Sequence, residues 1–308
     1  TSDAIWEAAE TALLEFESSK ILIDYAKKNG FNVDEGVAGI KTAFTASYGS
    51  GRPIIGILGE FDANAGISQK RKPVKETRIP GGAGHGCGHN LFGTASLGAA
   101  IAIKEQIEKG NIKGTVIFYG TPAEETIFAK VGMVREGLFD QLDVCMDWHP
   151  GDEIQAGTQS SKALVDFRVM FSGSSAHASS DPWNGKSASD AMELYTTGLN
   201  YYREHIEPTA RIHYQIEKAG DVVNVVPDYA QIWTRLRQNN RAGVDVLYER
   251  ALNIAKGAAL MTGTTFETKL ISGIYEIQVN RTGAAILQKN LETLGEIMYS
   301  DSELKYAN

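Results

Sequence analysis

Hydrophobic and polar positions in the first half of the chain form periodic runs that predict helices alternating with short strands. An amphipathic helical pattern opens the chain, and it extends from a cap at Ser2 or Asp3 to Gly30. Later helices are expected at 91–109 and 129–137, and strands at 31–33, 42–48, 54–61, 115–119 and 143–148. Helices that alternate with strands predict an α/β fold with a mainly parallel sheet and helices on its faces.

The pattern changes after Pro150, where strands of alternating polarity replace the fully apolar runs. The expected order is a strand at 164–171, a helix at 187–204, strands at 212–218 and 230–237, a helix at 244–261 and a strand at 265–271. This β-α-β-β-α-β order is that of a ferredoxin-like domain. Alternation in its strands favours an antiparallel sheet that two helices cover on one face. A further helix is expected at 282–297.

Composition narrows the classes of partner. Of the 308 residues, 43% are hydrophobic and 22% are charged, and the formal net charge of −8 argues against nucleic acid or an anionic membrane as the main partner. No apolar run approaches the roughly 18 residues of a membrane span, and no signal-peptide pattern precedes the first helix. Two cysteines cannot build a disulfide framework, so a cytoplasmic location is expected.

The segment with the most chemistry is a glycine-rich loop that reads GHGCGHN at 84–90. Cys87 and His89 lie two residues apart, so in an extended segment their side chains point the same way. The alternating glycines let the backbone turn sharply and approach a bound group closely. The loop ends a long polar stretch that starts at Asp62, and structureless loops of that length are commonly functional. These features are typical of a metal site built on a loop.

Further candidates follow the predicted strands. Glu124 and Glu125 come after the strand at 115–119, and His149 comes after the strand at 143–148. Ligands of parallel sheets bind beyond the carboxyl ends of the strands. One thiolate, two imidazoles and one carboxylate suit zinc, and also manganese or cobalt; the candidate ligands are Cys87, His89, Glu125 and His149. His85 is a weaker candidate, and Cys145 is expected in the core.

The adjacent pair Glu124 and Glu125 suggests a division of labour. On an irregular segment their side chains diverge, so one can bind a metal while the other faces a substrate. A hydrolase needs this division, because a metal polarises the scissile carbonyl and acidifies a water molecule, and a free carboxylate takes the proton of that water. The carboxylate then passes the proton to the leaving nitrogen. The same pair also fits a solvated helix start, where acids favour the helix dipole.

Three segments in this order carry a resemblance to a known family: GHGCGHNLFGTAS at 84–96, GTPAEE at 120–125 and DWHPG at 147–151. The chain resembles the dinuclear-metal amidohydrolases and peptidases that include aminoacylases, glutamate carboxypeptidases and auxin-conjugate hydrolases. The likeness includes SAHAS at 175–179 and NVVPDYA at 224–230, and it covers nearly the whole chain. Asn90 stands where other branches usually have Asp, which points to the branch of the p-aminobenzoyl-glutamate hydrolases.

The resemblance implies a role for each matching residue. It implies two divalent ions, Zn or Mn, with the ligands Cys87, His89, Glu125 and His149. It makes Glu124 the general base, and it makes His177 the residue that reaches across a homodimer interface to stabilise the tetrahedral oxyanion. Asn224 and Arg237 match positions that hold a substrate carboxylate, a task that suits a bidentate arginine. Each has a plainer explanation, since His177 can cap a turn and Arg237 can be a solvated strand residue.

The resemblance also implies a reaction and a division of the chain. The reaction is hydrolysis of the amide bond of an N-acyl or N-aroyl amino acid, such as p-aminobenzoyl-glutamate, or of a small peptide. Residues 1–158 match the first part of the catalytic domain, 159–273 an inserted dimerisation (lid) domain, and 274–308 the start of the returning catalytic part.

The sequence departs from the family pattern in two respects. Family members are longer, and their tail supplies a last metal-binding histidine, whereas this sequence has no histidine after His213. We therefore expect an incomplete site in the 308-residue chain, with exposed core along one edge of the sheet. The strand that ends near Glu60 also lacks the His-x-Asp ligands of other branches, so Asp62 is expected at most to support a ligand.

Two other hypotheses account for part of the pattern. In the first, Cys87 is a nucleophile with His89 or His149 as its base. Residues two apart on a loop are poorly placed for that pairing, and Glu124 and Glu125 then have no role. In the second, the chain is a truncated dimeric homologue that binds an acyl amino acid or a partner protein without hydrolysing it.

Overall fold

A computed structural model describes residues 1–307, and the chain divides into two compact units. Unit 1 comprises Thr1–Gln155 and Leu287–Asn308, and unit 2 comprises Ala156–Ile286. Within the described part of the chain, no helix is both long enough and apolar enough to cross a membrane. The roles predicted for the parts of the chain remain predictions.

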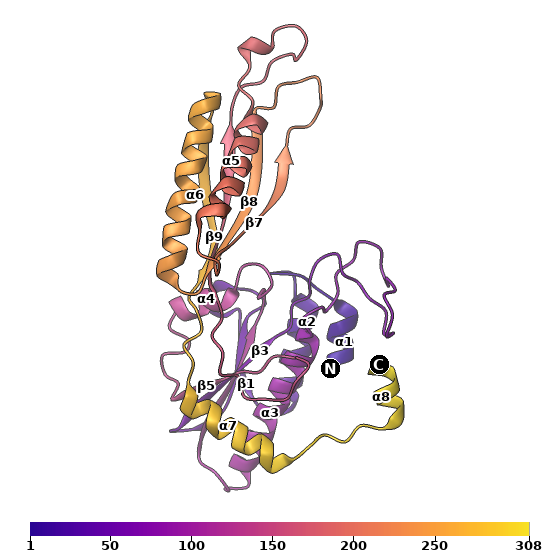
Figure 1. The fold of residues 1–308 in the computed structure, drawn as a ribbon. Coiled ribbons are helices and arrows are strands. Elements are labelled where there is room, and N and C mark those ends of the chain that lie inside the picture. The colour runs from indigo at the N-terminus through magenta and orange to yellow at the C-terminus, as the bar shows by residue number, and fades with distance from the viewer. Residues whose placement is uncertain (308) are drawn as a thin grey trace. The chain divides into compact units, whose positions relative to one another are not determined.

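Unit 1 is an α/β sheet with helices on both faces (Figure 1). Its strands are β1 Asn32–Glu35, β2 Phe44–Ser50, β3 Ile54–Glu60, β4 Gly114–Thr121 and β5 Val144–Met146, in the spatial order β1-β2-β4-β3-β5. One face packs on α1 Ser2–Ala8, α2 Phe16–Lys28 and α3 His89–Glu108, and α4 Ala129–Arg135 lies on the other. The C-terminal helices are α7 Arg281–Leu294 and α8 Asp301–Ala307.

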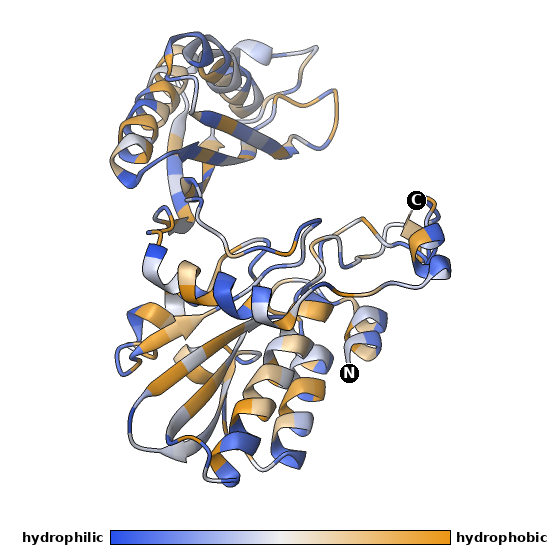
Figure 2. Ribbon diagram, turned by 60° about the horizontal axis from the view of Figure 1, so that its bottom comes forward, coloured by the Kyte–Doolittle hydropathy of each residue, from blue (hydrophilic) through white to orange (hydrophobic). Residues whose placement is uncertain are grey.

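The α/β prediction is confirmed, and the sheet of unit 1 is mixed. β3 pairs in parallel with β4 on one side and β5 on the other, while β2 pairs antiparallel with β1 and β4. β4 is buried on both faces, because Phe118 packs with α2 and α3 and its neighbour Tyr119 packs on the α4 side. The near-continuous apolar colour of the strands in Figure 2 reflects this burial. The carboxyl ends of the three parallel strands, β3, β4 and β5, lie at the same end of the sheet.

The prediction of one unbroken N-terminal helix is wrong, because α1 and α2 are separate helices. Ala9 and Leu13 have φ angles of 43° and 62°, a left-handed conformation that ends α1 and shapes the link to α2. The carboxylate of Glu10 then accepts hydrogen bonds from the amides of Glu17 and Ser18 at 3.0 and 2.7 Å, which caps the start of α2.

The break also turns Glu15 into the interior. Glu15 is the N-cap residue of α2, and it is completely buried. Its Oε2 accepts a hydrogen bond from Thr42 Oγ1 at 3.1 Å, and its Oε1 accepts one from the amide of Ala123 at 3.0 Å. A helix that continued through this position would point the carboxyl group elsewhere, so the break brings residue 15 to the segment that follows β4.

The long polar loop is present as predicted, and residues 61–88 contain no helix or strand longer than an isolated bridge. It is attached to α1. The guanidinium groups of Arg71 and Arg78 stand 4.6 and 5.0 Å from the ring centre of Trp6, within cation–π range. His85 Nε2 lies 3.1 Å from the carbonyl oxygen of Ile5. His85 therefore faces the N-terminal helix.

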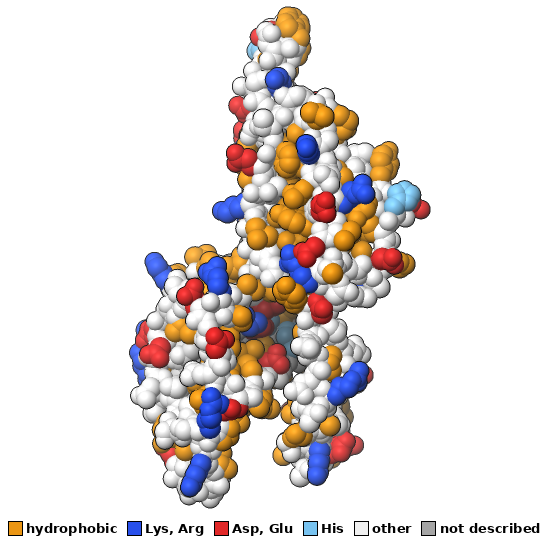
Figure 3. Space-filling view, turned by 90° about the vertical axis from the view of Figure 1, so that its left-hand side faces the viewer, with side chains coloured by type: hydrophobic (Ala, Val, Ile, Leu, Met, Phe, Trp, Pro, Cys, Tyr) orange, Lys and Arg blue, Asp and Glu red, His pale blue; other side chains and the backbone are white. Residues whose placement is uncertain are grey.

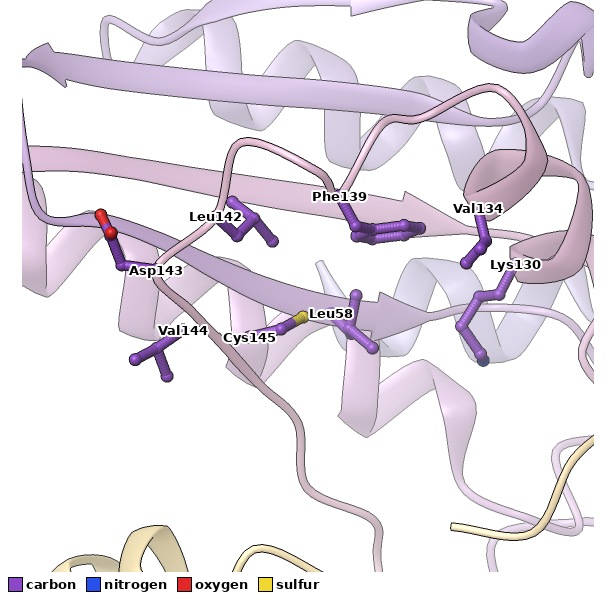
Figure 4. Close-up of a pocket in the computed structure, with 8 residues that line it drawn as sticks. All are labelled: Leu58, Lys130, Val134, Phe139, Leu142, Asp143, Val144 and Cys145. Carbon is purple, nitrogen blue, oxygen red and sulfur yellow. The ribbon is translucent and has the colours of Figure 1, made fainter. Parts of the chain in front are cut away.

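The prediction that Cys145 lies in the core is wrong, because its strand β5 is the edge of the sheet and Cys145 is exposed. Figure 4 shows this edge, where Cys145 and Leu58 lie beside apolar side chains from the segment before β5. Val144 is also an exposed apolar side chain, at 49%. The expectation of exposed core along one sheet edge fits β5.

Unit 2 has the predicted β-α-β-β-α-β order. Its elements are β6 Ala163–Ser172, α5 Ala188–Tyr202, β7 Arg211–Ala219, β8 Tyr229–Gln238, α6 Arg241–Thr262 and β9 Thr265–Ile274. The strands pair antiparallel in the order β7-β8-β6-β9, and α5 and α6 cover one face around Phe167, Tyr195 and Leu236. Charged and apolar side chains are mixed over the surface in Figure 3, so no single charged patch dominates that view.

The buried carboxyl group of Glu15 makes the stability of the fold depend on pH. Burial raises the pKa of Glu15 from 4.5 to about 7, and the charge of Asp62 acts in the same direction. Since the folded state keeps the proton at pH values where the unfolded state has lost it, stability falls as pH rises from about 4.5 through about 7. The whole shift corresponds to about 3 kcal/mol.

We expect Glu15→Gln to remove this pH-dependent loss. The amide has no charge to bury, its oxygen can accept the Ala123 hydrogen bond, and its nitrogen can donate to Thr42. The difference in free energy of unfolding between variant and wild type should therefore grow by up to about 3 kcal/mol between pH 5 and pH 8. Urea titrations at both pH values measure it, and a difference independent of pH would contradict the assignment.

Candidate metal centre

The four residues identified as candidate metal ligands converge beyond the carboxyl ends of the parallel strands in unit 1. Cys87, His89 and His149 each offer an atom within 4.8 Å of the others. Oε1 of Glu125, which follows β4, lies 3.9 Å from His89 Nε2. The cluster therefore joins the glycine-rich loop with the segments that follow β4 and β5.

Local backbone geometry explains how the glycine-rich loop reaches the carboxyl ends of the parallel strands. Gly88 has a φ of +75° and is the N-cap residue of α3, so the chain turns there in a conformation that favours glycine. A Cβ atom on Gly88 would also stand 3.0 Å from Cγ of Pro150. His89, the first residue of α3, is completely buried. The turn thus places an imidazole ring at the centre of the cluster and lets the 147–150 segment approach.

Both histidines leave one ring nitrogen free for a ligand. His89 Nδ1 lies 3.1 Å from both the carbonyl oxygen and Oδ1 of Asp62, and His149 Nδ1 lies 2.9 Å from the carbonyl oxygen of Pro150. Since carbonyl and carboxylate oxygens only accept, both Nδ1 atoms are the donors, which leaves each Nε2 as the atom that can bind an ion once the ring is neutral. Such hydrogen bonds are usual at metal-binding histidines. Asp62 therefore orients the ring of His89, a candidate ligand.

An unpaired buried atom supports a missing group at this point. Glu125 Oε1 is buried without a hydrogen-bond partner, and the buried His89 Nε2 faces the carboxylate of Glu60 at 3.0 Å. Buried polar atoms without a partner are uncommon in folded proteins, and an ion is one of the standard explanations. A soft thiol, two imidazoles and a carboxylate are ligands that zinc accepts. The donor set therefore fits a divalent metal ion.

Two residues that the sequence analysis did not select also belong to the cluster. Ligand atoms of Glu60, His89 and Glu124 lie within 4.8 Å of one another, and Glu60 Oε2 is 3.0 Å from His89 Nε2. Lys130, at the start of α4, forms an ion pair with the other oxygen of Glu60. The available signal was the spacing of Glu60, the last residue of β3, and Asp62, which follows two residues later. Lys130 had no comparable signal.

The acidic surroundings shift the pKa values of the central groups. Burial alone would lower the pKa of His89, but hydrogen bonds and charges from Asp62 and Glu60 outweigh it and raise the value to about 10. Burial, together with the charge of Glu60, raises the pKa of Glu124, while Lys130 acts in the opposite direction. A carboxylate whose pKa is raised toward neutrality is better suited to accept a proton in catalysis.

The environment of Cys87 does not resemble that of a reactive thiol. Burial raises the pKa of Cys87 to about 12, and the hydrogen bond and charge of Glu125 add to this. Nucleophilic cysteines have lowered pKa values in electropositive surroundings. The acidic cluster is the opposite environment, and only a bound metal would favour the thiolate here.

In unit 2 the structure brings together two of the three other candidates. His177 forms a bridge with Val225, and the amide of Ala178 donates to the carbonyl oxygen of Asn224 at 3.0 Å. The exposed ring of His177 has Nδ1 3.2 Å from Ser179 Oγ. His177 and Asn224 therefore lie on two paired loop segments.

Arg237 lies apart from that pair. It is near the far end of β8, and its Nη1 is 3.2 Å from Nδ1 of His213. Eight residues of strand separate it from Tyr229, which is roughly 26 Å at the rise of a β-strand. Within unit 2, Arg237 and Asn224 therefore do not form one binding site.

Comparison with known proteins identifies the family of the chain. Residues 57–300 match the model of peptidase family M20/M25/M40, which is most of the chain. The chain belongs to this family. Over 99% of its own length, the chain is 41% identical to one of the subunits of p-aminobenzoyl-glutamate hydrolase from Escherichia coli K12. It spans 64% of the length of that relative.

Solved structures share the fold. The aminobenzoyl-glutamate utilization protein of Klebsiella pneumoniae matches with a TM-score of 0.69 at 20% identity, over 92% of this chain and 77% of that one. A Bacillus subtilis protein described as a dinuclear metal binding peptidase from the M20 family matches with a TM-score of 0.61 at 19% identity, over 95% and 79%. The M20 family thus includes proteins that bind two metal ions.

Removal of a ligand tests the metal centre directly. We expect Cys87→Ala and His89→Ala each to weaken zinc or manganese binding by more than roughly 100-fold, which is the upper range for losing a residue that only supports a ligand. Equilibrium dialysis with elemental analysis measures the bound metal. Cys145→Ala is the matched control for Cys87→Ala, because it removes the chain's other cysteine, which lies on the edge strand β5. Equal metal binding by all three variants and the wild type would refute the site.

Proposed function

We propose that this protein is a metal-dependent amidohydrolase that releases an amino acid from an N-acyl or N-aroyl amino acid of the p-aminobenzoyl-glutamate type. The observation that carries the proposal is the convergence of Cys87, His89, Glu125 and His149 on one point, with Glu124 beside them. The name of the Escherichia coli relative supports the substrate class. Small peptides are the second substrate class to assay.

Two divalent ions, zinc or manganese, held by these residues would polarise the scissile carbonyl and make a water molecule more acidic. Glu124 accepts the proton of the attacking water and delivers it to the leaving nitrogen, which makes the amine a better leaving group. Burial and the charge of Glu60 raise the pKa of Glu124, which matches it to both steps. Burial alone would raise the pKa of Glu60, but His89 and the ion pair with Lys130 outweigh it and lower that pKa, so Glu60 does not compete for the proton.

The residues of unit 2 serve the substrate in this proposal. His177 donates a hydrogen bond to the developing oxyanion, and Asn224, on the segment paired with it, holds the substrate beside it. Arg237 binds the substrate carboxylate through two parallel N–H groups. His177 reaches this substrate across the interface of a homodimer. The protein acts in the cytoplasm.

Replacement of the base tests the reaction. We expect Glu124→Gln to lower kcat for p-aminobenzoyl-glutamate by about 10²- to 10⁴-fold, because the amide cannot take the proton of water. Bound metal and KM should change little. Glu136→Gln, an exposed carboxylate after α4, is the control. Release of p-aminobenzoate measured by chromatography gives the rates, and an undiminished kcat would exclude Glu124 as the base.

Complementation tests the homodimer. A mixture of Glu124→Gln and His177→Ala chains, each nearly inactive alone, should recover about a quarter of wild-type activity, since half of the chains pair in mixed dimers and each mixed dimer holds one intact site. Light scattering should give the mass of a dimer at micromolar concentration. Recovery of no activity, or a monomer by mass, would show that His177 does not act across an interface.

The same assay separates the competing hypotheses. A chelator should abolish turnover, whereas a thiol alkylator should leave metal-saturated enzyme active, because the metal site shields Cys87. The reverse pattern would support Cys87 as nucleophile. Fewer than one bound metal per chain, with no turnover of any acyl amino acid or dipeptide, would support a homologue that only binds ligand.

A further inference from the structure

The segment that carries Glu124 and Glu125 is a strained turn between β4 and α4. Ala123 and Phe128 have φ angles of 57° and 55°, although neither is glycine, and both are buried. The carbonyl oxygen of Ala123 accepts hydrogen bonds from the amides of Ile127 and Phe128 at 3.3 and 2.9 Å. Left-handed conformations of this kind persist only where the surrounding structure holds them.

Two distant carboxyl groups hold the backbone on either side of Glu124. The amide of Ala123 donates to Oε1 of Glu15 at 3.0 Å, and the amide of Glu125 donates to Oδ2 of Asp62 at 3.0 Å. Asp62 also orients His89, so it belongs to the metal centre. Glu15 contacts neither His89 nor the other candidate ligands through any hydrogen bond or ion pair in the described residues. Its connection to the site is the Ala123 amide.

The burial of Glu15 lowers the stability of the fold, so a functional reason for its position is expected. The residue is completely buried, and an ionisable group in that environment destabilises the fold unless its hydrogen bonds compensate. The bond to Thr42 Oγ1 does not require a carboxyl group, because a hydroxyl group can donate to many acceptors. The Ala123 amide does need an acceptor at this depth, since an unpaired buried amide is unfavourable.

We propose that Glu15 is a positioning residue that holds Ala123 in its left-handed conformation and so aims the carboxylate of Glu124. This proposal rests on the proposed function, in which Glu124 moves the proton. Loss of the acceptor frees the Ala123 amide, and the strained turn relaxes toward an ordinary conformation. Because Glu124 is the next residue, its carboxylate moves, and a displacement of about 1 Å can lower the rate by about 100-fold.

The test compares three variants of the full chain. Glu15→Ala removes the acceptor, and Glu15→Gln keeps an oxygen that can accept from Ala123. Glu10→Ala removes the nearby carboxylate that caps the start of α2, and this carboxylate makes no hydrogen bond to the turn. Two readouts are measured on each: hydrogen exchange of peptides that cover 121–128, and kcat, KM and bound metal with p-aminobenzoyl-glutamate.

We expect Glu15→Ala to speed exchange in 121–128 by at least about tenfold and to lower kcat by roughly 10- to 100-fold, with KM and bound metal unchanged. Glu15→Gln should recover most of both losses, and Glu10→Ala should show neither. A merely structural role predicts that bound metal and kcat fall and KM rises together in Glu15→Ala and Glu10→Ala alike. That result would overturn the proposal.

The two proposals fail in different ways. If Glu15→Ala leaves exchange in 121–128 unchanged, Glu15 does not hold the turn, whatever the activity. A second outcome is that Glu15→Ala raises exchange without changing kcat, while Glu124→Gln is inactive. In that case the conformation of the turn does not determine the rate, and the positioning role of Glu15 is excluded. If Glu124→Gln is fully active, the proposed function has failed, and the exchange data still report whether Glu15 holds Ala123.

Discussion

The parallel pairing of β3 with β4 and β5 is the constraint on which the candidate site depends. Parallel strands that are neighbours in a sheet end on the same side, so the segments after each of them are forced together. Glu60 ends β3, and the segments that follow the three strands carry Asp62, the pair Glu124 and Glu125, and His149. Any slip in register would move the following residues by one strand rise, about 3.3 Å, which exceeds the tolerance of a metal site.

Charge balance is the second constraint. Four carboxyl groups surround the buried ring of His89, and Lys130 is the basic residue that pairs with one of them; the four are Glu60, Asp62, Glu124 and Glu125. Excess buried negative charge is unfavourable unless protons or cations compensate it. Protonated His89 supplies one compensating charge, and its raised pKa measures how strongly the cluster attracts cations. A divalent ion would replace that proton.

The strands, the ferredoxin-like order of unit 2 and the convergence of the four candidate ligands were predictable from the sequence, because each depends on local periodicity or on position relative to a strand end. Contacts between distant segments were not. Glu15 meets Ala123 across 108 positions, and the helix break that permits it left no sequence signal. Cys145 looked like a core residue because an edge strand and an inner strand have the same apolar pattern. The separation of Arg237 from Asn224 depends on strand length, which motif matching ignores.

The N-terminal segment illustrates how such distant contacts build the site. Residues 1–15 precede the 57–300 segment that matches the family, yet they touch the glycine-rich loop and the turn after β4. His85 packs on the carbonyl oxygen of Ile5, and Asn90, the last residue of the glycine-rich loop, donates to Ser2 Oγ at 3.0 Å. Glu15 reaches the turn from the other side. Because the loop itself has no regular structure, its geometry must come from what packs against it. The candidate ligands thus lie within the 57–300 segment, while part of their orientation comes from residues that precede it.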